Sequence, residues 1–146
     1  MAERPHVTVA TVIEKEGQFL LVKEEEQGAV VYNQPAGHVE WNETLQDAAL
    51  RETLEETGWR VALQSLLGIY QYTSAANGIS YVRHCFVAEA IEPVPDARLD
   101  SEIIAAEWLT LAEISELESR LRSPMVLRAI DDYRRHVSYP LELIQE

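Results

Sequence analysis

The sequence predicts a single α+β domain over residues 1–146, in which strands precede and follow one clear helix and two more helices lie near the C-terminus. Three observations support this prediction. A chain of 146 residues fits one domain of ordinary size. Its 47% hydrophobic and 25% charged residues are typical of globular proteins and exclude a disordered chain. Apolar, β-branched segments recur between turn residues, whereas residues 42–57 show the pattern of a helix.

Strands are predicted where apolar and β-branched residues cluster between turns. The predicted ranges are 6–13, 18–23, 29–32, 59–72, 79–90 and 103–109. Asn77-Gly78, a strong turn dipeptide, joins two of them. Residues 61–82 carry no charge and are long enough to span a bilayer, but polar residues interrupt them, so strand–turn–strand is the favoured interpretation.

Other segments are predicted to form loops or helices. Glu24-Glu25-Glu26 is a charge run, which is typical of a solvated loop. The string Gln34-Pro35-Ala36-Gly37 is predicted to stop regular structure, because it contains proline and glycine. A last pair of helices is predicted at 111–121 and 124–136.

The clearest helix covers residues 42–57. Asn42 or Thr44 can cap its start, and Gly58 suits the left-handed conformation that follows a helix end. The arc predicted to pack on a sheet comprises Ala49, Leu50, Thr53 and Leu54. A different arc, at spacings i, i+3 and i+4, comprises Glu52, Glu55 and Glu56.

The three glutamates conflict with two rules of helix stability. Like charges at i, i+4 repel by about 0.2–0.5 kcal/mol, and the dipole at the end of a helix favours basic residues. A hard divalent cation such as Mg²⁺ would resolve both conflicts, because it prefers carboxylate oxygens. A solvated acidic face is the alternative, and it is the favoured interpretation of this cluster taken alone.

Net charge and cysteine content restrict the possible functions. Twelve basic and 25 acidic residues give a net charge of −13, which repels nucleic acids and anionic membranes, so neither is predicted as a partner. An anionic substrate is still compatible with this charge if a divalent cation bridges the two. The single cysteine, Cys85, excludes a disulfide framework and suits a cytoplasmic location. Its neighbour His84 points to the opposite face of a strand, so a cysteine hydrolase is not predicted.

The spacing around the glutamates resembles the Nudix box. From Gly37 the sequence reads GHVEWNETLQDAALRETLEETGW: Gly37, five residues, Glu43, seven residues, Arg51-Glu52, then Glu55-Glu56, one residue and Gly58. One position departs from the pattern, because Thr53 stands where an aliphatic residue is usual. We expect this side chain to pack against the sheet. Trp59 fills the final hydrophobic position.

Strings outside the box resemble the NudJ branch of bacterial Nudix phosphatases. They are Pro5-His6-Val7-Thr8-Val9-Ala10, Asn33-Gln34-Pro35-Ala36-Gly37-His38, Leu121-Arg122-Ser123-Pro124 and Tyr139-Pro140-Leu141-Glu142. The resemblance implies an α/β/α sandwich with a mixed sheet between helices. It also implies hydrolysis of phosphoanhydride bonds with Mg²⁺, or with Mn²⁺. The implied substrates are nucleoside tri- and diphosphates and a thiamin-pyrimidine precursor diphosphate, with orthophosphate released.

The resemblance also implies which residues hold the metal. Glu52, Glu55 and Glu56 would bind it together with the backbone carbonyl of Gly37. The cation would neutralise the phosphates, while a carboxylate takes a proton from the attacking water. Glu102, in the loop before the last predicted strand, resembles the loop glutamate that assists metal or water in many Nudix enzymes; a solvated loop acid is the alternative.

Other residues near the box have two interpretations each. Arg51 is a candidate phosphate ligand, but a structural pair with Glu43 is favoured. His38, Lys23 and Arg83 are candidates for substrate binding, with surface or strand roles as alternatives. The aromatic residues that can stack on a base are Tyr32, Trp41, Tyr70 and Tyr72. Packing in the core is the favoured role for these aromatic side chains.

Two alternative functions compete with catalysis on small substrates. A Nudix-fold nucleotide-binding or regulatory module that has lost catalysis predicts damage among the three glutamates, and none is seen. An mRNA-decapping enzyme would require a basic groove, which a net charge of −13 does not favour. The sequence therefore predicts an enzyme for a small nucleotide or phosphorylated metabolite, acting as a monomer or a homodimer.

Overall fold

Seven strands form the centre of the computed structural model, which describes residues 3–146. The strands are β1 (His6–Lys15), β2 (Gln18–Glu26), β3 (Ala29–Asn33), β4 (Ala36–His38), β5 (Trp59–Thr73), β6 (Ser80–Pro93) and β7 (Ile103–Thr110). The helices are α1 (Leu45–Thr57), α2 (Leu111–Glu116) and α3 (Met125–Arg134), with short 3₁₀ turns η1 (Glu118–Arg120) and η2 (Leu141–Leu143).

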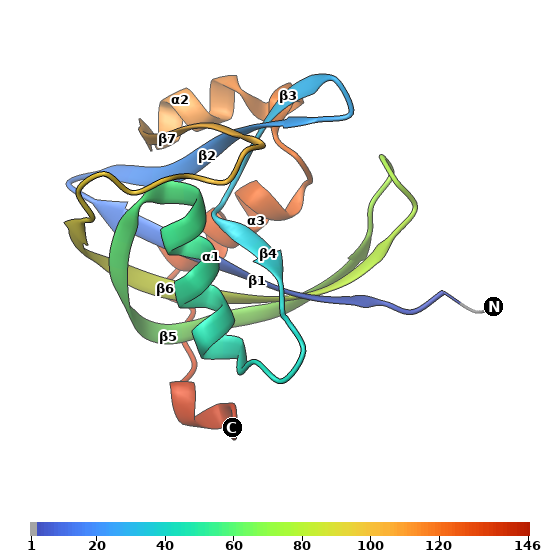
Figure 1. Ribbon diagram of the computed structural model, residues 1–146, viewed down its shortest axis with the longest axis vertical. Helices are drawn as coiled ribbons and strands as arrows, with labels where there is room; N and C mark the ends of the chain where they lie inside the picture. The colour runs from blue at the N-terminus through green and yellow to red at the C-terminus, as the bar shows by residue number, and fades with distance from the viewer. Residues whose placement is uncertain (1–2) are drawn as a thin grey trace.

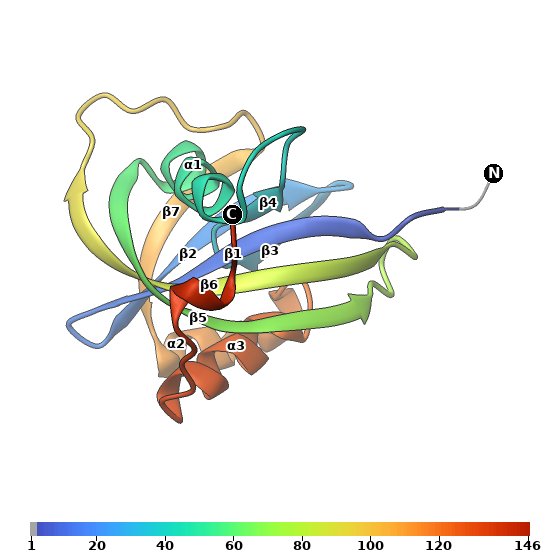
Figure 2. The same cartoon turned by 90° about the horizontal axis from the view of Figure 1, so that it is seen from below.

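The sheet is mixed and lies between helices. Its order is β3-β2-β1-β6-β5, while β4 pairs with β1 and β7 pairs with β2. Strands β1 and β6 run parallel, and the other pairs are antiparallel. Figures 1 and 2 show α1 on one face of the sheet and α2 and α3 on the other. The predicted α/β/α sandwich is thereby confirmed.

Two apolar layers hold the helices to the sheet. On one face, Ala48 and Ala49 of α1 pack with Val9 and Phe86 of the sheet. On the other face, Ile114 and Ile130 from α2 and α3 belong to a cluster that also contains the buried Cys85. Burial raises the pKa of Cys85 to about 11, which agrees with the prediction that this thiol is not a nucleophile.

The charge run Glu24-Glu25-Glu26 is not a solvated loop, because β2 continues through it. Glu24, Glu25 and Glu26 pair in register with β3 across a two-residue turn at Gln27-Gly28. Both turn residues have positive φ, 50° and 82°, as a tight hairpin requires. Only 4% of Glu24 is exposed. The strand accommodates this carboxylate because Arg122 forms an ion pair with it.

The predicted break at Gln34-Pro35-Ala36-Gly37 is shorter than expected. Strand pairing resumes at Ala36, and β4 pairs with Thr8–Ala10 of β1. The carbonyl of Pro35 accepts a hydrogen bond from Thr11 N at 3.0 Å, so the chain stays beside β1 through the break. Proline lacks an N–H group, but its carbonyl still contributes to the sheet edge.

Helix α1 begins and ends with the predicted caps. Thr44 Oγ1 accepts a hydrogen bond from Asp47 N at 3.1 Å, and Gly58 adopts a φ of 73° after the last turn. The predicted packing arc is only half right. Ala49 and Thr53 are buried, but 37% of Leu50 and 39% of Leu54 are exposed. The buried stripe of the helix is centred on Ala49 and Glu56, which places both leucines beyond its edge.

Thr53 packs against the sheet as expected. The side chain is fully buried, and its Oγ1 lies 2.9 Å from Oγ1 of Thr11 on β1. Its hydroxyl also donates to the carbonyl of Ala49 at 2.8 Å. A polar contact therefore replaces the aliphatic one at this position of the box.

The C-terminal elements differ from the prediction at one place. The helix predicted at 111–121 ends at Glu116 and continues as the 3₁₀ turn η1, whereas α3 lies within the predicted range 124–136. Residues 61–82 lie in β5, the following turn and β6, as predicted. Among residues 3–146, no helix combines the length and apolar character needed to cross a membrane.

Candidate active site

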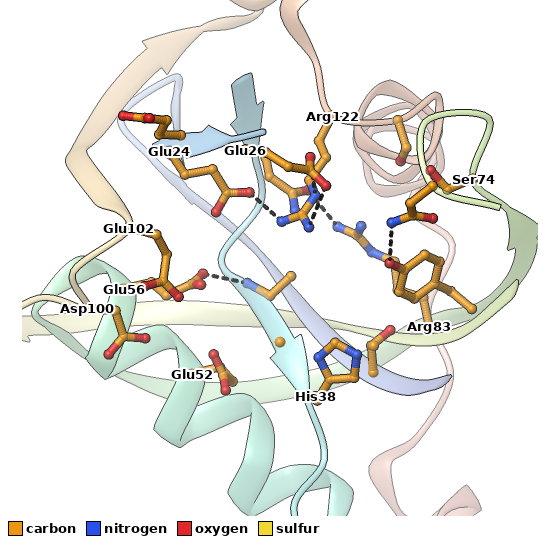
Figure 3. Close-up of a pocket in the computed structure, with 18 of the residues that line it drawn as sticks. Glu24, Glu26, His38, Glu52, Glu56, Ser74, Arg83, Asp100, Glu102 and Arg122 are labelled. Atoms are coloured by element: carbon orange, nitrogen blue, oxygen red, sulfur yellow. Dashed lines mark hydrogen bonds and ion pairs between the residues drawn. The ribbon is translucent and has the colours of Figure 1, made fainter. Parts of the chain in front are cut away.

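A cavity of about 410 Å³ opens where the end of α1, the strands β2, β4 and β6, and the loop before β7 meet (Figure 3). Its acidic lining residues are Glu24, Glu25, Glu26, Glu40, Glu52, Glu56, Asp100 and Glu102. Two arginines, Arg83 and Arg122, also line it. The volume suits a small molecule, but carboxylates dominate the wall, so an anionic ligand needs an additional cation.

Gly37 and Glu52 meet at the cavity wall. A Cβ atom at Gly37 would lie only 2.1 Å from Cδ of Glu52, so any other residue would displace this carboxylate. Glycine at this position thus lets the Glu52 carboxylate lie directly against β4. The structure brings these two predicted residues together.

Three carboxylates form a compact group. The ligand oxygens of Glu52, Glu55 and Asp100 lie within 4.8 Å of one another. The backbone fixes Asp100, because its N–H donates to the carbonyl of Glu55 at 3.0 Å. Asp100 was not predicted from the sequence, although it stands two residues before Glu102 in the same loop.

Glu56 lies beside this group but is much more buried. Only 6% of the residue is exposed, and Oε1 accepts a hydrogen bond from Ala36 N at 2.9 Å. Burial raises the pKa of Glu56 to about 9, even though this hydrogen bond favours the charged form. At neutral pH the carboxyl group therefore keeps its proton unless a cation compensates for the charge.

Arg51 connects the acidic residues of the box. It binds Glu43 through two hydrogen bonds, from Nε at 2.7 Å and from Nη2 at 3.0 Å. Its Nη1 donates to Glu52 at 2.7 Å and more weakly to Glu55 at 3.2 Å. The predicted pair of Arg51 with Glu43 is present. The pKa of Glu52 is nevertheless raised, because burial outweighs the effect of Arg51.

Arg83 is a buried cation without an acidic partner. Only 3% of the residue is exposed, and Nη2 donates to the amide oxygens of Gln34 at 2.7 Å and Asn33 at 3.3 Å. Within residues 3–146, its Nε has no hydrogen-bond partner. A buried guanidinium held only by neutral groups is destabilising, so an anion in the cavity would compensate for its charge.

A second arginine reaches the cavity from the segment before α3. Arg122 Nη1 lies 2.6 Å from Oε1 of Glu24, and Nε lies 3.1 Å from Oε2 of Glu26. Burial raises the pKa of Glu24 despite this partner. The sequence interpretation assigned no role to this pair, since the two partners stand 98 residues apart.

Of the other predicted catalytic and substrate-binding residues, two line the cavity and one does not. Glu102 and His38 line the cavity, and the pKa of His38 is lowered by burial and by the neighbouring His6, which favours a neutral ring. Nε2 of His38 lies 2.9 Å from Nδ1 of His6. Lys23 of β2 does not line the cavity, although the three residues that follow it do. The structure therefore does not bring Lys23 to the site.

The four aromatic candidates separate in the same way. Tyr32 and Tyr70 are core residues, as favoured, with 7% and 8% exposed. Tyr72 lines the cavity. Trp41 is 98% exposed in the loop before α1 and does not line the cavity, so the favoured core role is wrong for this residue.

Known proteins resemble this chain in sequence and fold. Residues 2–129 match the NUDIX domain family. Phosphatase NudJ of Escherichia coli K12 is 41% identical over 141 residues, covering 97% of this chain and 91% of the relative. A NUDIX hydrolase from Nitrosomonas europaea is 42% identical with a TM-score of 0.95, covering 98% of this chain and 97% of that one. A MutT NUDIX hydrolase from Burkholderia pseudomallei is 28% identical with a TM-score of 0.73, covering 89% and 98%. The chain therefore belongs to the Nudix hydrolase family.

Proposed function

We propose that this chain hydrolyses phosphoanhydride bonds in nucleoside tri- and diphosphates and related small diphosphates, and releases orthophosphate. One observation carries the proposal: a single cavity joins Glu52 and Asp100 of the carboxylate group to the buried Arg83, which has no acidic partner among residues 3–146. A polyphosphate fits both features, since a divalent cation can bridge it to the carboxylates while Arg83 binds another phosphate. A thiamin-pyrimidine precursor diphosphate belongs to the same substrate class.

The carboxylate group fits a hard divalent cation. All its donors are carboxylate oxygens, which Mg²⁺ and Mn²⁺ prefer, and Glu52 reaches the β4 backbone only because Gly37 has no side chain. Glu52, Glu55 and Asp100 would hold the ion, with Glu56 and the Gly37 carbonyl as further ligands. When bound, the ion would neutralise phosphate charge and polarise a P–O bond.

The protein's own groups would orient the substrate and move the proton. Arg83 would bind a phosphate through the part of its guanidinium that lines the cavity, while Gln34 and Asn33 hold Nη2 in place. Glu102, an exposed carboxylate at the cavity wall, would accept a proton from the attacking water. Phosphoryl transfer depends chiefly on such positioning and charge neutralisation.

Relatives and composition support the same proposal. Phosphatase NudJ shares 41% identity with nearly the whole chain, and its name describes a phosphatase. The intact carboxylate group speaks against a regulatory module that has lost catalysis. A net charge of −13 continues to disfavour nucleic acids and anionic membranes as partners. A cytoplasmic location and a monomeric or homodimeric state stay predictions.

Product analysis tests the proposed reaction. We expect a nucleoside triphosphate and Mg²⁺ to yield orthophosphate and the nucleoside diphosphate, with further trimming possible. Hydrolysis in ¹⁸O-labelled water, followed by mass spectrometry of both products, identifies the phosphorus atom that is attacked. EDTA should abolish turnover. Pyrophosphate and the nucleoside monophosphate as the sole products would contradict orthophosphate release, and no turnover across a panel of phosphorylated metabolites would contradict the proposal itself.

Glu102→Gln tests the role of the loop carboxylate. The change keeps the shape and removes the proton acceptor, so we expect turnover to fall about 100-fold. The melting temperature should stay nearly constant, because Glu102 is exposed and, among residues 3–146, its side chain accepts a hydrogen bond from Ser101 alone. Steady-state rates and thermal melts measure both effects, with Glu25→Gln on the same cavity wall for comparison. Full turnover in Glu102→Gln would mean that another group accepts the proton.

A further inference from the structure

The cavity has an aromatic end that the proposed hydrolysis does not use. Tyr72 of β5 and Tyr81 of β6 line it, and their rings stack with centroids 5.4 Å apart at 26°. Ser74 and Asn77, from the connection between these strands, line the same end. Figure 3 shows Ser74 and Arg83 on the same side of the cavity, opposite the α1 glutamates.

Strand register orders the cavity from the carboxylates to this aromatic end. Thr8 of β1 pairs with His38 of β4 on one side and with Arg83 of β6 on the other. Arg83 thus lies two strand spacings from β4, roughly 10 Å. Tyr81 stands two residues farther along β6 on the same face, roughly 7 Å beyond Arg83. The carboxylate end at β4, Arg83 and Tyr81 therefore follow one another in the same order as two phosphates and the organic group of a nucleotide.

The local structure holds Tyr81 in place. Nδ2 of Asn77 donates to the Tyr81 hydroxyl at 3.0 Å, and Oδ1 of Asn77 accepts from Ile79 N at 2.9 Å. The ring of His6 meets the Tyr81 ring edge-on, with centroids 5.7 Å apart. Because the phenol oxygen accepts the bond from Asn77, its own hydrogen is available to a ligand.

We propose that the Tyr72–Tyr81 pair binds the nitrogen heteroaromatic ring of the substrate, while Arg83 and the carboxylate group handle its phosphates. This inference rests on the proposed function and names the part of the substrate that selects it. A flat, electron-rich aromatic wall favours stacking, which does not depend on the identity of individual ring atoms. The pair therefore accepts purine and pyrimidine rings alike. With the ring here, the terminal phosphate is the one that reaches the carboxylates.

Comparing a ligand with a ring and one without tests this assignment. The KM for ATP and the competition constant of inorganic tripolyphosphate are measured for wild type, Tyr81→Leu and Tyr81→Phe, with CTP in parallel. The leucine removes the aromatic face but keeps an apolar side chain. We expect Tyr81→Leu to raise the ratio of the KM for ATP to the competition constant of tripolyphosphate about tenfold. The corresponding ratio for CTP should rise by a similar factor. Tyr81→Phe, which keeps the ring, should retain a ratio close to that of wild type.

Several outcomes would overturn the assignment. An unchanged ratio in Tyr81→Leu, or an equal rise of both constants, would mean that the ring does not bind here. If Tyr81→Leu does not fold in thermal melts, Tyr72→Leu provides the same test, because it removes the other ring of the stacked pair. Absence of hydrolysis by wild type would refute the proposed function instead. ATP and tripolyphosphate binding to the same variants, measured by calorimetry without turnover, would then decide the ring contact separately.

Discussion

Glu56→Gln is expected to abolish most activity while leaving the metal-free protein at least as stable as wild type. The glutamine keeps the shape of the side chain, and its oxygen can still accept the hydrogen bond from Ala36 N. Loss of the charge removes a proposed metal ligand, so turnover should fall at least about 100-fold. Stability should not fall, because the buried carboxyl group of Glu56, with a pKa of about 9, is already protonated at neutral pH.

The same variant should change how stability depends on pH. Burial raises the pKa of Glu56 from its ordinary value of 4.5 to about 9. Above about pH 4.5 the folded metal-free chain therefore keeps a proton that the unfolded chain releases. The contribution of Glu56 to the free energy of unfolding is complete below about pH 4.5. It is lost as the pH rises towards 9, by up to about 1.4 kcal/mol per pH unit. Glu56→Gln lacks this loss, so its stability relative to wild type should increase with pH.

Denaturant unfolding in EDTA between pH 5 and 8 measures this difference, and repeating it with millimolar Mg²⁺ tests the metal site. Mg²⁺ stabilises wild type only through binding to the folded state, by RT ln(1 + [Mg²⁺]/Kd). That increment should shrink or vanish in Glu56→Gln. A variant that is clearly less stable in EDTA and gains as much from Mg²⁺ as wild type would show that Glu56 is structural, and that the metal binds elsewhere.

Arg51→Ala is expected to damage both folding and catalysis. The guanidinium contacts Glu43, Glu52 and Glu55, and its removal leaves these carboxylates to repel one another. Breaking a buried pair costs about 3–5 kcal/mol, and the lower end applies because 23% of the Arg51 side chain is exposed. Turnover should fall about 10- to 100-fold, since Glu52 loses the group that orients it.

Arg60→Ala is the matched control for this loss. Arg60 forms an ion pair with Glu92 on the surface, where 61% and 52% of the two side chains are exposed. Such a pair contributes about 0–1 kcal/mol, so the control should stay close to wild type in both measurements. Equal melting temperatures for the two variants would contradict the supporting role of Arg51, and a loss of activity without a loss of stability would favour direct phosphate binding.

The sequence predicted those parts of the site that depend on local spacing. Gly37, Arg51, Glu52 and Gly58 belong to one short motif, and helical periodicity alone brings Arg51 to Glu52 and Glu55. Their placement follows from a single turn-and-helix unit. Thr44 and Gly58 likewise mark the helix ends through their own backbone and side-chain preferences.

Contacts between distant segments were not predictable in this way. Glu24 is buried only because Arg122 meets it across 98 positions of sequence, and a charge run gives no sign of such a partner. The exposed Leu50 and Leu54 show a related limit. Small residues let α1 approach the sheet closely, and the buried face of the helix includes Glu56 instead of the two leucines. The carboxyl group of Glu56 accepts a hydrogen bond from Ala36 N there. Apolar character alone did not reveal that rotation.

The threonine contact between α1 and β1 has a consequence for how these sequences can diverge. Because Thr53 gives its hydrogen to Ala49, the hydrogen in its contact with Thr11 comes from Thr11. An aliphatic residue at position 53 would strand the Thr11 hydroxyl in a dry interior, at about 1–3 kcal/mol. We therefore expect positions 11 and 53 to change together, so that an aliphatic residue at position 53 is accompanied by an apolar residue at position 11.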